Sequence, residues 1–496
     1  MNSLHTPLYS PGQIRAIERQ AIDQQGIPSL DLMHKAGRAV FAEIAERWPK
    51  LNRILILAGA GNNAGDGYVI AKLALQAGYQ TFVLSLTDPQ QLAGDALSCF
   101  QEYQQSGGDV CLGDFESINS VDLIVDALFG IGLNRALSDR HQTLIAWANQ
   151  AAAIRVAVDI PSGLDANTGA VLGEQAFLAD LTVTFIAGKP GLYTGAAVNY
   201  TGEIVIADLD LPADSLDVVT AEHFLLAKLP LSPRPKNVHK THFGHVLLVG
   251  GNQGYVGAII LAAEAALRSG AGLVSVATRA SHSHLLSMVR PEIMSHEVED
   301  AEQFRPLLEK ATVIVVGPGL GQDQWAQCLL QQILMSDKAC VWDADALNWL
   351  AVNPRRFNNC IFTPHPGEAS RLLNCSTTDI AKDRFAAVQA LQSKYGGIWV
   401  LKGAGSLISD GHQVWVSITG NPGMASGGMG DVLAGLSGGL LAQGLSELQA
   451  CQLAVYVHGE AADISAAKDG ERGMLASDVI AHLRLCLNNN SSDLQS

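Results

Sequence analysis

The 496-residue sequence lacks several features that mark whole classes of protein. Lys and Arg total 32 against 48 Asp and Glu, and they form no basic block, so we expect no nucleic-acid partner. The eight cysteines include no Cys-x-x-Cys pair, which argues against a zinc cluster and favours reduced thiols. The first residues lack the basic and apolar segments of a signal peptide. These absences predict a cytoplasmic protein.

Long hydrophobic runs are also missing. Residues 246–263 carry no charge, but the polar, glycine-rich residues 250–254 interrupt them and predict a strand–turn–helix unit, not a membrane span. Aromatic residues make up 6 % of the chain, whereas apolar residues reach 48 % and glycine contributes 49 residues. This profile is typical of α/β domains with tight turns. With a net charge of −16, an anionic ligand has to be held by local donors such as helix N-termini.

Short apolar strands alternate with helices in two series. A helical stretch at residues 11–47, broken at 26–28, precedes strands at 53–58, 81–86, 121–127 and 155–159, with a helix at 68–76. A second series has strands at 245–249, 312–316, 340–342 and 398–401. Between the series the pattern weakens, and Pro230, Pro233 and Pro235 lie close together. We therefore predict two α/β domains, residues 1–220 and 221–496, each with a mostly parallel sheet.

Residues 59–67, Gly-Ala-Gly-Asn-Asn-Ala-Gly-Asp-Gly, follow the first strand of the first series. Glycines at such a turn let backbone N–H groups approach a phosphate. The Gly59-x-Gly61-x-x-Ala64 pattern also matches a dinucleotide fingerprint, with Asp88 placed where a ribose-binding acid could lie. A nucleotide-binding dehydrogenase therefore remains open at this point, as does a purely structural turn with Asx hydrogen bonds.

Two carboxylates, Asp126 and Asp159, end apolar strands of the first series. Ligands of open α/β sheets bind beyond the carboxyl ends of strands, where burial can raise a carboxyl pKa for acid–base work. Either Asp could instead be a helix N-cap. Together with Asn63 and Ser162 they could supply oxygen ligands to a monovalent or hard cation.

Residues 58–67, 126–133 and 158–165 resemble, in order, three motifs of the NAD(P)H-hydrate epimerase family. The resemblance spans about residues 9–211 and implies interconversion of the R and S epimers of hydrated NADH or NADPH. It implies Asp159 as the acid–base group and a potassium ion held by Asn63, Asp126 and Ser162. Lys189 would steady a developing charge, unless it is an ordinary solvated lysine. The substrate residues implied are Asn62, Asn63, Ala64, Gly65, Asp66, Gly130, Ile131, Gly132, Leu133, Asn134, Arg135, Ala136 and Asp159.

A glycine-rich loop at residues 421–430 opens a helix in the second series, and Asp431 stands at its mouth. Backbone amides in such a loop can stabilise a transferring phosphoryl group, and the Asp can accept the proton of the receiving hydroxyl. Asp431 could alternatively be a helix cap. Residues 402–406, Lys-Gly-Ala-Gly-Ser, follow a strand directly and suggest a second phosphate loop.

These features resemble the ribokinase-like superfamily. Residues 245–251, 317–321, 343–348 and 363–368, with the Asp431 loop, narrow the resemblance to the NAD(P)H-hydrate dehydratase family over about residues 235–486. Ala258, Gly319, His365 and Asp431 would then contact the hydrated cofactor. Lys402, Gly403, Ala404, Gly405, Ser406 and Gly430 would contact the nucleotide. Family members often carry Thr at positions 406 and 429, where this chain has Ser406 and Met429. His365 could also be a packed loop histidine.

Together the resemblances imply a bifunctional repair enzyme: a Rossmann-like three-layer α/β/α epimerase domain followed by a ribokinase-like α/β dehydratase domain. The dehydratase would use ADP, as the fused bacterial form does, with magnesium, and release AMP and phosphate. Asp431 would be its base. We expect small-molecule partners, no membrane and a homo-oligomer. The alternatives are a kinase of a small metabolite with a dinucleotide-binding regulatory domain, and a non-catalytic dinucleotide sensor.

Overall fold

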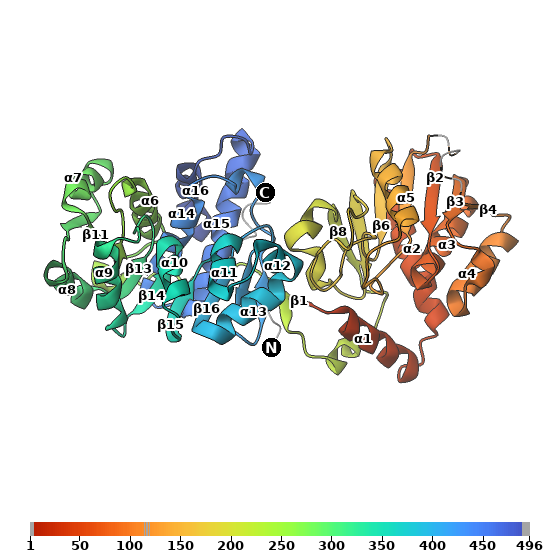
Figure 1. Ribbon diagram of the computed structural model, residues 1–496. Helices are drawn as coiled ribbons and strands as arrows, with labels where there is room; N and C mark the ends of the chain where they lie inside the picture. The colour runs from red at the N-terminus through yellow and green to blue at the C-terminus, as the bar shows by residue number, and fades with distance from the viewer. Residues whose placement is uncertain (1–3, 114, 116–117, 119, 489–496) are drawn as a thin grey trace. The chain divides into compact units, whose positions relative to one another are not determined.

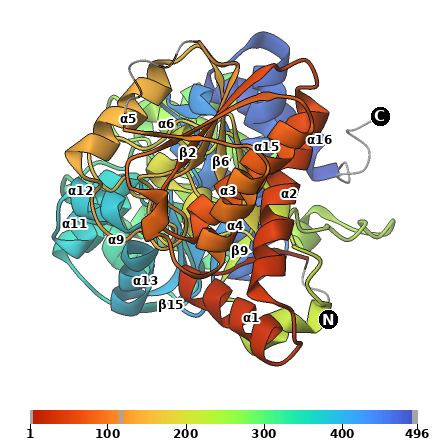
Figure 2. The same ribbon diagram turned by 90° about the vertical axis from the view of Figure 1, so that its right-hand side faces the viewer.

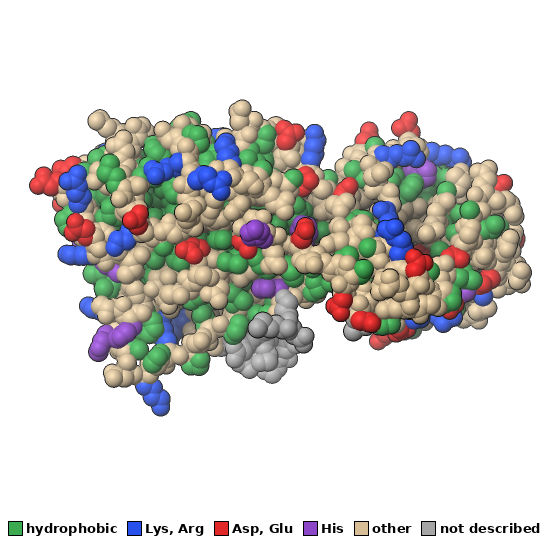
Figure 3. All heavy atoms as spheres, turned by 90° about the horizontal axis from the view of Figure 1, so that it is seen from below, with side chains coloured by type: hydrophobic (Ala, Val, Ile, Leu, Met, Phe, Trp, Pro, Cys, Tyr) green, Lys and Arg blue, Asp and Glu red, His purple; other side chains and the backbone are tan. Residues whose placement is uncertain are grey.

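The computed structural model describes residues 4–113, 115, 118 and 120–488. The chain divides into two compact units (Figure 1). The N-terminal unit is Pro7–His223, and the C-terminal unit comprises residues 224–488 together with residues 4–6. Figure 3 shows basic and acidic side chains interspersed over each unit on the face that it displays. Among the described residues, no helix is both long enough and apolar enough to cross a membrane.

Seven parallel strands form the sheet of the N-terminal unit, in the order β4-β3-β2-β5-β6-β7-β8. From β2 the chain runs outward through β3 and β4, then crosses to the other side of β2 and continues from β5 to β8. The strand order therefore reverses between β2 and β5, where open α/β sheets bind ligands. The strands are β2 (Arg53–Ala58), β3 (Gln80–Ser85), β4 (Val110–Leu112), β5 (Leu123–Ala127), β6 (Ile154–Val158), β7 (Leu181–Phe185) and β8 (Glu203–Ala207).

Helices cover both faces of this sheet. Helices α2 (Ser29–Arg47), α3 (Asn62–Gln76) and α4 (Gly94–Gln105) pack side by side in one layer, as Figure 2 shows, and α5 (Asp139–Gln150) covers the other face. Along β2, Ile54 and Ile56 join the core under α2–α4, whereas Leu55 and Leu57 join the core under α5. Successive strand residues point to opposite faces, so a sheet covered on both sides needs such continuous apolar strands. The predicted three-layer α/β/α arrangement is confirmed.

The helical stretch predicted at residues 11–47 forms α1 (Pro11–Asp23) and α2, with the break where the sequence indicates it. The prediction of a glycine loop before a helix at Tyr68 is wrong, because α3 already begins at Asn62. Its glycines serve close packing. An added Cβ at Gly65 would lie 2.3 Å from Sδ of Met33, and one at Gly67 would lie 2.7 Å from Cβ of Ala127.

The sheet of the C-terminal unit has eleven strands in the order β1-β9-β18-β17-β16-β15-β14-β13-β10-β11-β12, and its strands β1 and β9 each extend by one or two residues beyond the bounds of the unit. Strands β10–β16 are parallel, and β17 and β18 continue the sheet antiparallel. Here the strand order reverses between β10 and β13. The strands are β1 (Thr6–Leu8), β9 (His223–Leu225), β10 (His245–Val249), β11 (Leu273–Thr278), β12 (Met294–Glu297), β13 (Val313–Val316), β14 (Ala339–Trp342), β15 (Phe357–Phe362), β16 (Gly396–Leu401), β17 (Leu407–Ser409) and β18 (Val414–Val416).

One face of this sheet packs against a core formed with four helices: α6 (Val256–Arg268), α14 (Met429–Ala442), α15 (Glu447–Asp469) and α16 (Ala476–Asn488). Helices α6 and α14 approach closely, since an added Cβ at Gly435 would lie 1.9 Å from the carbonyl oxygen of Ala262. The remaining helices are α7 (Ala280–Val289), α8 (Ala301–Lys310), α9 (Gln324–Leu334), α10 (Ala344–Val352), α11 (Pro366–Leu373), α12 (Thr377–Lys382) and α13 (Arg384–Tyr395). The α/β domain with a mostly parallel sheet that the sequence predicts for this half is confirmed.

Residues 4–6, which the sequence places in the first domain, group instead with the C-terminal unit. The ring nitrogen Nδ1 of His5 accepts a hydrogen bond of 3.0 Å from the backbone N–H of Ala227, and its ring packs edge-on against Trp415. These contacts join segments far apart in sequence, so no local pattern could indicate them.

Candidate active sites

Asp159 follows β6 directly and occupies the heart of the first site. It adopts a φ of 67°, a strained conformation for a residue other than glycine that persists only where neighbours fix it. Its Oδ1 accepts hydrogen bonds from Nζ of Lys189 at 2.6 Å and Oγ1 of Thr184 at 3.2 Å. Its Oδ2 accepts one from the backbone N–H of Ile131 at 3.3 Å. Asp159 is therefore bonded by groups from the loop after β5, from β7 and from the loop after β7, and it does not cap a helix.

Lys189 is fully buried, which excludes the solvated-lysine interpretation. Besides Asp159, its ammonium donates to Oγ1 of Thr184 at 2.7 Å and to the carbonyl of Phe185 at 2.8 Å. All three ammonium protons thus have acceptors, as a buried charge requires. The ion pair places a fixed positive charge beside the predicted acid–base carboxylate.

Asp126, in β5, is completely buried and is bonded to Ser162. Its Oδ2 accepts from the Ser162 N–H and its Oδ1 from the Ser162 hydroxyl, both at 2.7 Å, and Oδ1 also accepts from the Leu128 N–H at 3.1 Å. Burial raises the pKa of Asp126 to about 6, although these bonds oppose the rise. Among the described residues, no cationic side chain forms an ion pair with it. The carboxylate is thus not a helix cap, and a bound cation would suit it.

The three motifs of the first half meet at Gly130. An added Cβ there would lie 3.1 Å from Oδ1 of Asn63 and 3.2 Å from Oδ2 of Asp159. The side-chain nitrogen of Asn63 is buried without a hydrogen-bond partner among the described residues. Because amide N and O are assigned from their partners, this orphaned end could equally be the oxygen. Asn63 is therefore available to a ligand or cation.

Two further carboxyl groups, those of Asp66 and Glu18, lie within electrostatic reach of the Asp159–Lys189 ion pair, and the four side chains form a charge cluster. Burial and the negative charges of Asp159 and Glu18 raise the pKa of Asp66 well above its usual range. Burial, followed by the charge of Asp159, also raises the pKa of Glu18, which lies in α1. Asp66 comes from the predicted substrate motif, but Glu18 was missed, because a half-buried glutamate in an amphipathic helix carries no local signal of function.

The predicted substrate loop at residues 130–136 leads outward from this cluster. Ile131 bonds to Asp159, whereas Asn134, Arg135 and Ala136 are exposed. Asp88, the possible ribose-binding acid of a dehydrogenase, instead caps the short helix Pro89–Gln91, accepting a hydrogen bond from the Gln90 N–H at 3.0 Å.

The second site lies at the amino end of α14. Gly428, with a φ of 92°, precedes the helix and offers no side-chain cap, so the first backbone N–H groups of α14 lack helical acceptors. Asp431 is the third helical residue, which excludes the N-cap interpretation. Burial, followed by the charge of Asp343, raises the pKa of Asp431 to about 7. A donor-rich helix end and a carboxyl that titrates near neutrality thus lie together.

Lys402 lies against this helix end. An added Cβ at Gly430 would lie 3.1 Å from its Nζ, which donates to Oδ1 of Asp343 at 2.8 Å and lies 3.9 Å from Oε2 of Glu368. Thr363 also donates to Oδ1 of Asp343 at 2.8 Å. The structure therefore brings Lys402, Gly430 and Asp431 together, and the lysine is not an ordinary surface residue.

The loop at residues 402–406 is held from beneath by Arg384, a buried residue of α13 that no sequence motif indicates. Its guanidinium donates to the carbonyls of Leu401 at 3.2 Å and of Lys402 and Gly405 at 3.4 Å, and burial lowers its pKa to about 10. Gly403 has a φ of 142°, and an added Cβ would lie 2.8 Å from Nη1 of Arg384. The loop therefore requires a glycine at position 403 and a long cationic side chain, that of Arg384, packed beneath it.

His365 is the N-cap of α11, and its side chain is 52 % exposed, so it is not packed away. Its Nδ1 accepts from the Gly367 N–H at 3.0 Å, and Oε2 of Glu368 accepts from the His365 N–H at 2.8 Å. Burial raises the pKa of Glu368 to about 7.

Ala258 and Gly319 also come together, since an added Cβ at Gly319 would lie 3.3 Å from Cβ of Ala258. One turn further along α6, Leu261 packs against Gly428, because an added Cβ there would lie 2.6 Å from Cδ1 of Leu261. The same face of α6 therefore links Ala258 and Gly319 to the amino end of α14.

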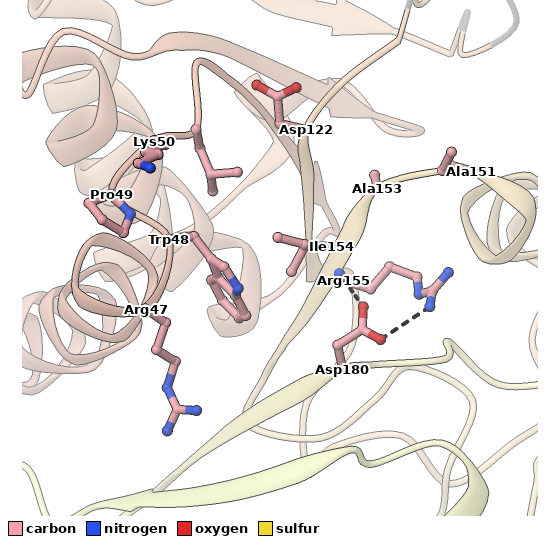
Figure 4. Close-up of a pocket in the computed structure, with 12 residues that line it drawn as sticks. Arg47, Trp48, Pro49, Lys50, Asp122, Ala151, Ala153, Ile154, Arg155 and Asp180 are labelled. Atoms are coloured by element: carbon pink, nitrogen blue, oxygen red, sulfur yellow. Dashed lines mark hydrogen bonds and ion pairs between the residues drawn. The ribbon is translucent and has the colours of Figure 1, made fainter.

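A cavity of about 970 Å³ opens at the opposite edge of the N-terminal sheet, beside the amino ends of β2, β5, β6 and β7. In Figure 4, Arg155 is paired with Asp180 on one side of it and Trp48 lies on the other. The cavity contains none of the predicted site residues. Its lining residues are Arg47, Trp48, Pro49, Lys50, Leu51, Asp122, Ala151, Ala152, Ala153, Ile154, Arg155 and Asp180.

Two family models match this chain, one in each unit. The model described as YjeF-related protein N-terminus matches residues 29–191, and the model described as NAD(P)H-hydrate dehydratase matches residues 246–484.

Relatives resemble the chain over nearly its whole length. The bifunctional NAD(P)H-hydrate repair enzyme of Coxiella burnetii is 45 % identical and covers 97 % of this chain and 100 % of its own. That of Escherichia coli is 43 % identical and covers 99 % of this chain and 95 % of its own. A solved ADP/ATP-dependent NAD(P)H-hydrate dehydratase from Bacillus subtilis, crystallised with ATP and Mg²⁺, is 28 % identical, with a TM-score of 0.47. It covers 52 % of this chain and 93 % of its own.

Proposed function

This chain belongs to the family of bifunctional NAD(P)H-hydrate repair enzymes, and we propose that its two units divide the repair between them. The N-terminal unit interconverts the R and S epimers of hydrated NADH and NADPH. The C-terminal unit dehydrates the S epimer, so the first activity supplies the second. The observation that carries the proposal is Asp431, a carboxyl titrating near neutrality beside Lys402 and the donor-rich end of α14.

Dehydration has to overcome a poor leaving group, the hydroxide on ring carbon 6. We propose that the substrate hydroxyl attacks the terminal phosphorus of ADP while Asp431 takes its proton, and AMP departs. The N–H groups at the start of α14 and the ammonium of Lys402 stabilise the transferring phosphoryl group. The lone pair of the ring nitrogen then expels phosphate, and loss of a proton from carbon 5 restores the dihydronicotinamide.

Epimerisation inverts carbon 6, which requires a bond at that carbon to break and re-form with transfer of the hydroxyl proton. We propose that Asp159 holds and returns that proton and that Lys189 balances the charge on the carboxylate. Asn62, Asn63, Asp66 and the loop at residues 130–136 would bind the dinucleotide. The buried ion pair and the strained backbone of Asp159 support this assignment, because both fix the carboxylate in one orientation.

We propose potassium for the first site and magnesium for the second. The buried Asp126 carboxylate, the Ser162 hydroxyl and the unpartnered amide of Asn63 form an oxygen-rich set that fits a monovalent cation. Bound there, potassium would neutralise a buried charge. Magnesium characteristically binds through substrate phosphates and one or two carboxylates, so we propose that it enters with the nucleotide. A homo-oligomeric state and a cytoplasmic location remain predictions.

We expect ADP to support faster dehydration than ATP at saturating substrate, because both activities are fused in one chain as in the ADP-using form of the family. The measurement is NADH absorbance regenerated from the S epimer with each nucleotide separately, with free phosphate assayed alongside. Faster turnover with ATP would reject the choice of donor. A stable phosphorylated product without NADH would favour the alternative, a small-metabolite kinase.

The pH dependence of dehydration should follow Asp431. Since its pKa is raised to about 7, the base form predominates above that pH and is lost below it. We therefore expect kcat/KM for the S epimer to be level at higher pH and to fall about tenfold per unit below about pH 7. Because Glu368 titrates in the same range and its charge contributes to the raised pKa of Asp431, Glu368→Gln serves as the control: the inflection should remain, at a slightly lower pH. A profile that stays level from about pH 5.5 to 8 would contradict the role of Asp431 as base.

A further inference from the structure

Helix α1 lies outside the three motifs and outside residues 29–191 matched by the family model, yet it reaches the first site. Nη2 of Arg15 donates a hydrogen bond of 3.2 Å to the carbonyl of Ile131. An added Cβ at Gly132 would lie 3.9 Å from the same nitrogen. The guanidinium of Arg15 thus lies over the start of the proposed substrate loop.

The other polar group of Ile131 is held by Asp159. The backbone N–H of Ile131 donates to Oδ2 of Asp159 at 3.3 Å, while Lys189 binds Oδ1 of the same carboxylate. Arg15 therefore holds Ile131 by its carbonyl, and the N–H of Ile131 in turn orients Oδ2 of Asp159, the proposed acid–base group.

Glu18 links Arg15 to the rest of the charge cluster. Residues three apart on a helix share a face, and the charges of Asp159, Lys189 and Arg15 all act on Glu18. The helix is anchored on its adjoining face by the buried Ile14 and Ile17, and at its start by a reciprocal hydrogen-bond pair between Ser10 and Gln13. Arg15 consequently projects from a fixed element.

We propose that Arg15 is a positioning residue for epimerisation, one that holds the substrate loop and, through Ile131, the orientation of Asp159. The inference rests on the proposed function of the N-terminal unit. Proton transfer to and from the hydroxyl at carbon 6 needs the carboxylate in one geometry, and misplacement by about 1 Å can cost about a hundredfold in rate. Losing the Arg15–Ile131 bond should therefore lower the rate of the chemical step more than it weakens binding.

The test compares Arg15→Met, Arg15→Lys and the control Arg19→Met in the full-length chain. Methionine keeps much of the aliphatic stem but donates no hydrogen bond, and lysine keeps the charge and a single donor centre. Arg19 is exposed on the same helix, and its side chain donates a hydrogen bond to the carbonyl of Arg15 within α1. For each variant, kcat and KM are measured for the R epimer, with dehydration of the S epimer as an internal reference and thermal unfolding as a check of the fold.

We expect Arg15→Met to lower kcat for the R epimer by about 10–100-fold, with Arg15→Lys between it and the parent and Arg19→Met unchanged. Dehydration of the S epimer should not change. A rise in KM at constant kcat in Arg15→Met would make Arg15 an anion-binding residue and overturn the proposal. An equal loss of kcat in Arg19→Met, or an unchanged kcat in Arg15→Met, would overturn it as well. If Arg15→Met does not fold, the kcat and KM of Arg15→Lys for the R epimer are judged by the same criteria. Failure of the parent to convert the R epimer would refute the proposed function instead.

Discussion

Replacing Asp431 by asparagine is expected to lower the rate of dehydration by about 10²–10⁴-fold, the usual cost of losing a general base. Asp431 is the third residue of α14, and burial with the charge of Asp343 raises its pKa to about 7. At neutral pH a large fraction is therefore a carboxylate that can take the hydroxyl proton. Asparagine keeps the size and much of the hydrogen bonding but cannot accept that proton.

Nucleotide binding should survive the same substitution. The groups proposed to hold the phosphates are backbone N–H groups at Gly428–Gly430 and the ammonium of Lys402, whose bond to Asp343 does not involve Asp431. We therefore expect the ADP dissociation constant, measured by calorimetry, to change little, and epimerisation to be unaffected. Asp478→Asn, in the first turn of α16, removes the same charge elsewhere and should leave dehydration intact. Activity of Asp431→Asn within about threefold of the parent would contradict its role as base.

Asp159→Asn is expected to stop epimerisation while dehydration of the S epimer continues in the same chain. A mixture of epimers should then react only to the extent of its S fraction and stall, apart from slow spontaneous epimerisation. The reason is the position of Asp159, bonded on one oxygen by Lys189 and on the other by the loop at Ile131. The measurement is the amplitude of NADH formation with excess ADP. Full conversion at the enzyme-dependent rate would reject the assignment.

This substitution also leaves Lys189 as a buried charge without its carboxylate, which typically costs about 3–5 kcal/mol. The double variant Asp159→Asn with Lys189→Gln removes both charges and is expected to unfold at a higher temperature than the single variant. It should nevertheless remain inactive in epimerisation. Recovery of epimerisation along with stability would show that the single variant lost activity through its fold and not through its chemistry.

The sequence indicates both sheets because strands that are buried on both faces have to be continuous apolar runs, which are visible in the sequence. Strands β2 and β10 have the predicted bounds, since each is a short apolar run ended by glycine. The acidic residues at the ends of β5 and β6 also lie where parallel topology predicts, at the edge of the sheet where strand order reverses.

Other features depend on contacts between distant segments and have no local pattern. The glycines of residues 59–67 suggest a loop, but Gly65 and Gly67 lie in α3 and make room for Met33 and Ala127. Arg15 and Arg384 resemble ordinary helix residues in the sequence, and only the fold places them against Ile131 and the loop after β16. Residues with a proposed chemical role were therefore predictable where they follow a strand end or a glycine-rich helix start, whereas the residues that support them were not.

Whether the two units act in sequence is measured by supplying the parent enzyme with a mixture of both epimers of hydrated NADH and excess ADP, and following NADH, AMP and free phosphate together. We expect all of the hydrate to become NADH, including the R fraction beyond its spontaneous epimerisation, with one AMP and one phosphate released per NADH formed. NADH formation that stops at the S fraction would refute the epimerase activity, and a phosphorylated hydrate that accumulates without releasing phosphate would refute the dehydratase activity.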